Sequence, residues 1–205
     1  MTEKILNPRS EQKRQQILQA AGVLFNQLGY AVSMSTIAKQ ADVSKQTVYS
    51  HFKTKDELFE RCIKEKCVAN KWESDLCNDL RPIREVLSEF AFNFQTMLMD
   101  EKAQETLKIA ISQRNSHPEL SKAYLQAGPK YSVNMLADYL QMHVSKGTLT
   151  LTIQATEAAI QLLLMFHGKS VYFAYLGEKN EQSEQQRRSY LDNCVDIFLA
   201  GNSAR

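Results

Sequence analysis

Residues 33–58, SMSTIAKQADVSKQTVYSHFKTKDEL, constrain the fold of this 205-residue chain more than any other segment. Ile37 and Ala41 recur at helical spacing, and Val48 and Phe52 do so again after a short polar turn. Two helices this short cannot bury an apolar stripe alone, so each must pack against the other. The segment therefore predicts a helix-turn-helix.

The outward face of the second helix is polar throughout. Its side chains can all donate hydrogen bonds to phosphate oxygens or base edges, which a purely structural helix does not require. Taken singly, Tyr49 and His51 could equally pack on neighbouring residues. The candidate DNA-contacting residues on this helix are Lys45, Gln46, Thr47, Tyr49 and His51.

Helices are also predicted on both sides of this motif. Residues 10–28 carry apolar side chains at helical spacing and end before Gly29, a common helix stop. Residues 54–57, TKDE, form a capping-box pattern that opens a helix to about Trp72. We therefore expect a helix-turn-helix DNA-binding domain over residues 1–54 and a second, helical domain over residues 55–205.

Charge is distributed unevenly, although the formal net charge of the chain is only +2. Residues 1–55 contain eight lysines and arginines and three acidic residues, which gives +5 and leaves −3 for residues 56–205. A basic segment that coincides with the helix-turn-helix is what contact with a polyanion requires.

From about residue 79 onward the sequence shows no strand-like alternation of useful length. Helical stripes run through residues 83–98, 102–114, 118–144, 155–175 and 183–199, and Gly128-Pro129 should kink or interrupt the third of these. We therefore predict an all-α fold of about nine helices. A three-helix DNA-binding domain would precede a helical domain for ligand binding and dimerisation.

The helix-turn-helix and its flanks resemble the TetR family of bacterial one-component regulators. The family pattern stands here as Ile37-Ala38, residues 41–44, residues 48–52 and residues 55–58. One departure is Asp42, where the family usually has glycine. Asp is among the few other residues that tolerate left-handed backbone angles, so the turn should still form.

The resemblance implies a role for each matched polar residue. Ser44 would cap the second helix and residues 45–47 would face the major groove. The positions that match contacts with the DNA sugar-phosphate backbone in the family are Ser33, Tyr49, His51 and Lys55. The implied function is that of a DNA-binding regulator, a repressor that binds a pseudo-palindromic operator and is released by a small apolar or amphipathic molecule.

Large or adaptable apolar side chains recur at helical spacing after the motif, which suits either an ordinary core or a small-molecule pocket. TetR-like regulators typically hold an apolar pocket in this region, so the resemblance favours the pocket. The candidate pocket residues are Trp72, Phe90, Phe94, Met97, Tyr131, Met135, Tyr139, Met142, Met165 and Phe166.

The last two predicted helices offer more apolar surface than one subunit can cover. Residues 155–175 are apolar nearly all round, and residues 183–199 add a narrower stripe. A homodimer with four helices across a two-fold axis would cover both. The resemblance implies the same arrangement. The candidate interface residues are Leu191, Cys194, Val195 and Phe198.

Enzymatic, metal-binding and membrane functions lack sequence support. The sequence has no Gly-x-Ser-x-Gly, phosphate-binding glycine loop or His-Glu-x-x-His, and its four histidines and four cysteines are scattered. We expect no catalytic residue, no cofactor and no metal. Without a run of 18 apolar residues or an apolar leader, we expect a cytoplasmic protein with no membrane span.

Two other functions remain open. A ligand-independent DNA-binding protein with an architectural or partner-recruiting role would have a filled core in place of a pocket. A helical enzyme that carries a helix-turn-helix-like segment by chance would need a cluster of reactive side chains. The sequence offers no such cluster.

Overall fold

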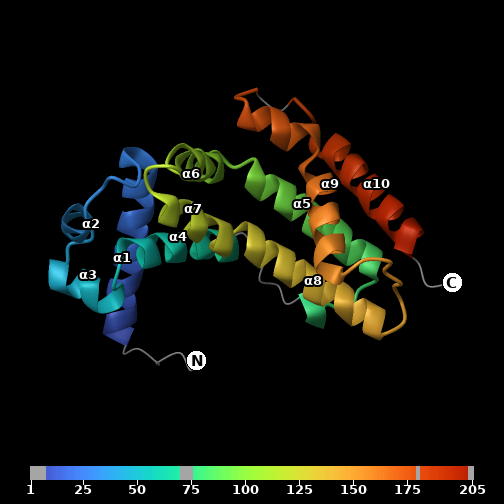
Figure 1. Cartoon of the computed structure of the whole chain (residues 1–205), viewed down its shortest axis with the longest axis horizontal. Helices are drawn as coiled ribbons and strands as arrows, with labels where there is room; N and C mark the ends of the chain where they lie inside the picture. Colours follow the sequence, from blue (N-terminus) through green and yellow to red (C-terminus); the bar gives the residue numbers. More distant parts are fainter. Residues whose placement is uncertain (1–7, 70–75, 179–180, 203–205) are drawn as a thin grey trace. The chain divides into compact units, whose positions relative to one another are not determined.

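A computed structural model describes residues 8–69, 76–178 and 181–202, and Figure 1 shows helices joined by short loops. These residues contain ten α-helices and one short 3-10 helix, η1. In chain order the elements are α1 (Pro8–Leu28), α2 (Met34–Gln40), α3 (Lys45–His51), α4 (Lys55–Ala69), η1 (Leu76–Asn78), α5 (Ile83–Leu98), α6 (Glu101–Ser112), α7 (Pro118–Ala127), α8 (Pro129–Ser145), α9 (Ala155–Tyr175) and α10 (Glu184–Asn202).

The predicted all-α fold is confirmed. One more helix than expected arises at Gly128-Pro129, where the segment 118–144 divides into α7 and α8. Pro129 occupies the first position of α8, where its fixed φ and missing N–H are tolerated, whereas inside a longer helix it would remove a backbone hydrogen bond. Within the described ranges, none of the helices has the length and apolar character needed to span a bilayer.

The chain separates into two compact units that differ from the predicted domains. The first runs to Lys66 and also includes Glu105–Gly128, and the second comprises Cys67–Gln104 and Pro129–Arg205. The boundary expected between residues 54 and 55 therefore falls inside the first unit. Most of α4 and all of α7 belong with the helix-turn-helix.

The core of the first unit joins α1, α2, α3 and α4. Ile17, Ile37, Val48 and Leu58 are fully buried, one from each of these four helices. Ile37 and Val48 belong to the apolar stripes that helical spacing indicates. Because α2 and α3 have only seven residues each, their stability depends on this packing.

An aromatic cluster accounts for the inclusion of α7 in the first unit. The Tyr30 ring lies edge-on to Phe59 at 5.7 Å between centroids and edge-on to His117 at 5.8 Å. The Tyr30 hydroxyl donates a hydrogen bond to Asp56 Oδ1. Burial, and secondarily Glu119, raises the pKa of that carboxyl, while His117 opposes the shift. His117, just before α7, thus packs on Tyr30, which in turn contacts Asp56 and Phe59 of α4.

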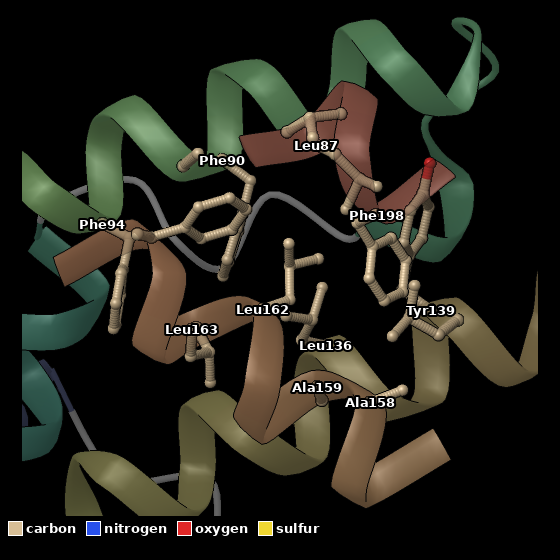
Figure 2. Packing of buried hydrophobic residues seen from close by; sticks show 14 of the residues in the cluster. Leu87, Phe90, Phe94, Leu136, Tyr139, Ala158, Ala159, Leu162, Leu163 and Phe198 are labelled. Atoms are coloured by element: carbon tan, nitrogen blue, oxygen red, sulfur yellow. The ribbon is translucent and has the colours of Figure 1, made fainter. Parts of the chain in front are cut away.

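The core of the second unit lies between α5, α8, α9 and α10. Leu87, Leu136, Leu162 and Leu191 are fully buried, one from each of these helices. Figure 2 shows Leu87 and Leu162 facing the same interior as Phe90 and Tyr139.

The predicted dimer-interface residues belong to this core instead. Figure 2 shows Phe198 of α10 among the buried side chains of the cluster. Leu191, Cys194 and Val195 are also buried within their own subunit, so none of the four is available to a second copy in this arrangement. Periodicity identified this buried stripe, but it does not identify what buries it.

An interruption of α9 at Gly168 was not foreseen. Its φ of 55° and ψ of −173° break the helix, although helical residues continue on both sides. The carbonyl of Met165 accepts a hydrogen bond from the Tyr190 hydroxyl at 2.9 Å. The carbonyl of Phe166 accepts one from Gln95 Nε2 at 3.0 Å. Side chains of α10 and α5 thus donate hydrogen bonds to carbonyls directly before the break.

Candidate nucleic-acid interface

Each of the two short helices begins with a serine cap. Ser33 Oγ accepts a hydrogen bond from the Thr36 backbone N–H at 3.0 Å, and Ser44 Oγ accepts one from the Thr47 N–H at 3.0 Å. A serine cap typically stabilises a helix by about 1 kcal/mol, which is substantial for helices of two turns. Both hydroxyls also lie on the exposed surface.

The turn between α2 and α3 has the backbone predicted for it. Asp42 adopts a φ of 51°, in the left-handed region. The following N–H of Val43 donates to the carbonyl of Ala38 at 3.0 Å and closes α2. Aspartate therefore adopts the left-handed conformation that glycine usually provides here, at a modest conformational cost.

Three side chains of α3 are exposed and suited to contact DNA. Lys45 and Gln46 lie in its first turn, and Tyr49 is 44% exposed. The Lys45 ammonium lies 5.9 Å from the Tyr49 ring centroid. Thr47 is half-buried, and its hydroxyl lies 2.8 Å from Ser44 Oγ. Lys45, Gln46 and Tyr49 are therefore better exposed for a groove or phosphate contact than Thr47.

His51, at the end of α3, is partly enclosed by α1. Burial lowers the pKa of its imidazole, and the Arg14 guanidinium lowers it further, against an opposing effect of Glu11. Arg14 also lies over the Phe52 ring, at 5.4 Å from the centroid, and 3.7 Å from Glu65. Near neutral pH His51 is thus held in its uncharged form, able to donate one hydrogen bond.

Lys55 forms hydrogen bonds within its own unit. Its Nζ donates to the carbonyl of Tyr30 at 2.8 Å and to that of Val32 at 3.4 Å, and lies 4.1 Å from the Tyr30 ring centroid. Burial lowers the pKa of Lys55, and Glu119 opposes this shift. The side chain anchors the loop between α1 and α2. The backbone contact with DNA implied by the resemblance would have to use the remaining donor or replace these bonds.

The predicted pocket residues are mostly core residues. Phe90, Phe94, Tyr139 and Phe166 are buried, and Met97, Met135, Met142 and Met165 pack against them. Tyr131 is half-buried, and Trp72 lies outside the described residues. A cavity of about 390 Å³ is present in the second unit, but of the predicted set only Met97 lines it.

One buried polar atom stands out in this otherwise apolar cluster. The Tyr139 hydroxyl has no hydrogen-bond partner among the described residues. Burial, with smaller effects of Asp79 and Cys77, raises the pKa of Tyr139 to about 12, so the phenol stays protonated. An unpaired buried donor of this kind costs about 1–3 kcal/mol.

Histidines and acidic groups do not assemble into a metal site in the part of the chain that the structure describes. His143 Nδ1 lies 2.8 Å from Thr148 Oγ1, and His167 Nδ1 lies 2.8 Å from the Leu163 carbonyl. Both imidazoles therefore have local partners.

Sequence reasoning missed two features of the second unit, the break at Gly168 and the side chains that bind its carbonyls. A glycine within the apolar run AAIQLLLMFHGKSVYFAY was the available signal. Gln95 and Arg187 gave none, because a glutamine or arginine on a helix is ordinarily a solvated residue.

Comparison with known proteins covers both parts of the chain. Residues 17–62 match the family model described as bacterial regulatory proteins, tetR family. Residues 85–201 match the model described as AefR-like transcriptional repressor, C-terminal domain. The uncharacterized HTH-type transcriptional regulator YvkB of Bacillus subtilis (strain 168) is 25% identical over 194 residues, which is 92% of this chain and 96% of YvkB.

Two solved structures show the same fold over nearly the whole chain. A TetR-family regulator from Mesorhizobium loti MAFF303099 is 26% identical with a TM-score of 0.77, covering 96% of this chain and all of that one (100%). The flavonoid-responsive regulator FrrA is 26% identical with a TM-score of 0.79, covering 95% of this chain and 99% of FrrA.

Proposed function

The chain belongs to the TetR family of bacterial transcriptional regulators, and on that premise we propose that it is a homodimeric repressor of the cytoplasm. It would bind a pseudo-palindromic operator and leave it when a small apolar or amphipathic molecule binds. The observation that carries the DNA-binding role is the exposed polar row of α3, with Lys45, Gln46 and Tyr49 on a helix held by Ser44 and buried Val48.

A second copy is the partner that fits α9 and α10. Ile160 and Leu164 lie one turn apart on α9 before its break, Tyr172 lies after the break, and all three are exposed. Tyr190 and Ile197 are exposed seven residues apart on α10. A homodimer would bury these side chains, and it would hold two α3 helices together for the two half-sites of an operator.

The proposed effector site is the apolar cluster around Tyr139. The Tyr139 hydroxyl, which has no partner among the described residues, supports a ligand that carries a hydrogen-bond acceptor, because such a ligand would accept from it. Nearby methionines can repack around a guest. FrrA is described as flavonoid-responsive, and flavonoids combine a flat apolar body with carbonyl and hydroxyl oxygens. They are the first class to test.

A second candidate function is ligand-independent DNA binding. The observation that favours it is the close burial of Phe90, Phe94 and Phe166, which leaves the predicted pocket filled by protein side chains. A ligand could enter only through a minor conformation in which these residues separate.

Fluorescence anisotropy of labelled operator DNA distinguishes the two functions. Flavones, flavanones and isoflavones would be titrated into the complex of DNA with wild-type protein and with Tyr139→Phe. We expect release by at least one compound, with a half-maximal concentration that rises several-fold in Tyr139→Phe while affinity without ligand is kept. Failure of every compound, and of a broader lipophilic library, to release the wild-type protein would favour ligand-independent binding.

A further inference from the structure

The cavity of about 390 Å³ lies between the carboxyl end of α5 and α10, within the second unit. Its size is in the range of small-molecule sites in proteins. It is a different place from the apolar cluster around Tyr139. The residues that line it are Asn93, Thr96, Met97, Met99, Asp100 and Arg187.

Arg187 is the unusual member of this lining. Its Nε donates to Gln95 Oε1 at 2.8 Å, its Nη2 donates to Thr96 Oγ1 at 2.7 Å, and its guanidinium lies 4.8 Å from the Phe92 ring centroid. A guanidinium has five N–H groups, so after these two bonds three remain for a further acceptor. The side chain is thus oriented by the protein without being saturated.

Arg187 also has no carboxylate within ion-pair distance among the described residues. The neighbouring Glu184 pairs with Arg188 instead, at 2.8 Å. Burial lowers the pKa of Arg187, Glu184 opposes that shift, and Arg188 adds to the lowering. A partly buried cation without an ion-paired carboxylate is unfavourable, so an anionic ligand would relieve it.

We propose that this cavity is a binding site for a small organic acid, whose carboxylate pairs with Arg187. The planar guanidinium favours a planar carboxylate, because two parallel N–H···O bonds can form. Met97 and Met99 line the same cavity and suit an apolar body. Asp100 opposes a second negative charge and suits a hydroxyl or amino group that donates to it.

A ligand here would act on the break in α9. Gln95 is almost fully buried, and its Nε2 donates to the carbonyls of Phe166 and His167 at 3.0 and 3.4 Å, directly before Gly168. Because Gln95 Oε1 accepts from Arg187, the arginine holds the amide in the orientation that α9 requires. A carboxylate on the remaining N–H groups would fix Arg187 and stabilise this arrangement.

The test uses 4-hydroxybenzoate as probe and the full-length protein, with methyl-labelled methionines observed by NMR. We expect saturable binding with a dissociation constant in the millimolar range or below, shifts concentrated on Met97 and Met99, and a higher melting temperature. 4-Hydroxybenzyl alcohol, which lacks the carboxylate, should bind at least tenfold more weakly. Equal binding of the alcohol would overturn the proposal.

Three substitutions and a second anion complete the experiment. Arg187→Gln should weaken 4-hydroxybenzoate at least tenfold, whereas Arg188→Gln, on the same helix and against the same Phe92 ring at 3.6 Å, should change it less than twofold. Arg187→Lys keeps the positive charge but loses the planar pair of N–H donors, so its affinity for 4-hydroxybenzoate should lie between those of the two glutamine variants. The absence of saturable binding to the wild type, equal losses in both glutamine variants, or inorganic phosphate binding as tightly as the acid would each contradict an organic-acid site.

Discussion

Lys55, the first residue of α4, donates hydrogen bonds to two carbonyls of its own unit, and this changes what its removal should do. Lys55→Met keeps the apolar stem and removes the ammonium. If the side chain is mainly an anchor, unfolding free energy should fall by about 1–2 kcal/mol, since hydrogen bonds from charged groups contribute more than neutral ones and partial exposure reduces the effect.

DNA binding measured against salt concentration separates the anchor from a phosphate contact. A lost phosphate contact flattens the log–log salt dependence by roughly one unit. We expect the log–log slope of the Lys55→Met variant to differ from the wild-type slope by less than about 0.5. A slope that changes by a full unit, without loss of stability, would show that Lys55 contacts a DNA phosphate.

His51 should make stability depend on pH in a defined direction. Its pKa is lowered in the folded protein by burial and by Arg14, so the unfolded chain binds more protons around pH 6. The contribution of His51 is present above the unfolded pKa of about 6.5 and is lost as pH falls through the lower folded value. His51→Gln should make the urea midpoint of unfolding depend less on pH between about pH 7 and pH 5. An unchanged profile would mean that another group controls acid stability.

Local rules explain how much of the helix-turn-helix could be predicted. Ser33 and Ser44 had to cap short helices, and Asp42 could replace glycine in a left-handed turn, since each depends on neighbours within a few residues. Lys55 was harder, because its acceptors on Tyr30 and Val32 are more than twenty residues away, at sequence separations of 25 and 23. The motif indicated a lysine at this position, but only the folded structure shows which carbonyls accept its hydrogen bonds.

At the scale of whole elements, the break in α9 makes Gly168 irreplaceable in a way that other glycines are not. A Cβ at Gly168 would lie 2.8 Å from the Tyr190 ring, and the φ of 55° disfavours any other residue. Gly177 has a φ of 87° with no atom within 4 Å of such a Cβ, so Gly177→Ala is a matched control that carries the backbone cost alone.

We therefore expect Gly168→Ala to destabilise the protein by about 2–4 kcal/mol, combining about 1 kcal/mol of backbone strain with displacement of the Tyr190 hydroxyl from Met165. Gly177→Ala should cost about 1 kcal/mol. Denaturant unfolding of both variants measures the difference. Equal losses would show that Tyr190 moves aside freely and does not hold the break.

The sequence patterns predicted the ranges of helices but not which surfaces these helices bury. The ranges of α5 and α9 could be predicted from periodicity, since Ile83–Leu98 and Ala155–Tyr175 begin and end where their stripes do. The dimer face could not, because Leu191 and Phe198 show the same spacing whether they meet their own subunit or a second one. Likewise, the aromatic residues of the predicted pocket look alike in a filled core and around a ligand.

For the whole molecule, the exposed face of α9 and α10 predicts the oligomeric state. Leu164 is 63% exposed in the single subunit. Leu164→Asp would place an unpaired carboxylate in the proposed interface, at a cost of several kcal/mol in the dimer and little in the monomer. Leu80→Asp is the control, because Leu80 is 94% exposed outside these helices.

Sedimentation should show a dimer for the wild type and Leu80→Asp and a monomer for Leu164→Asp, with lower operator affinity in the monomeric variant. Monomeric wild type, or a Leu164→Asp variant that dimerises as tightly as the wild type, would place the contact on another surface.

The measurement that tests the central claim most directly is selection of genomic DNA fragments by the purified protein, followed by affinity measurements on the selected site. We predict a pseudo-palindrome with half-sites about one helical turn apart, 34–36 Å, or a multiple of it. The double variant Lys45→Ala/Gln46→Ala should lose at least 1 kcal/mol, roughly fivefold in affinity or more, on the selected site and much less on random duplex. Recovery of fragments without a shared site, or equal losses on both duplexes, would contradict sequence-specific recognition by α3.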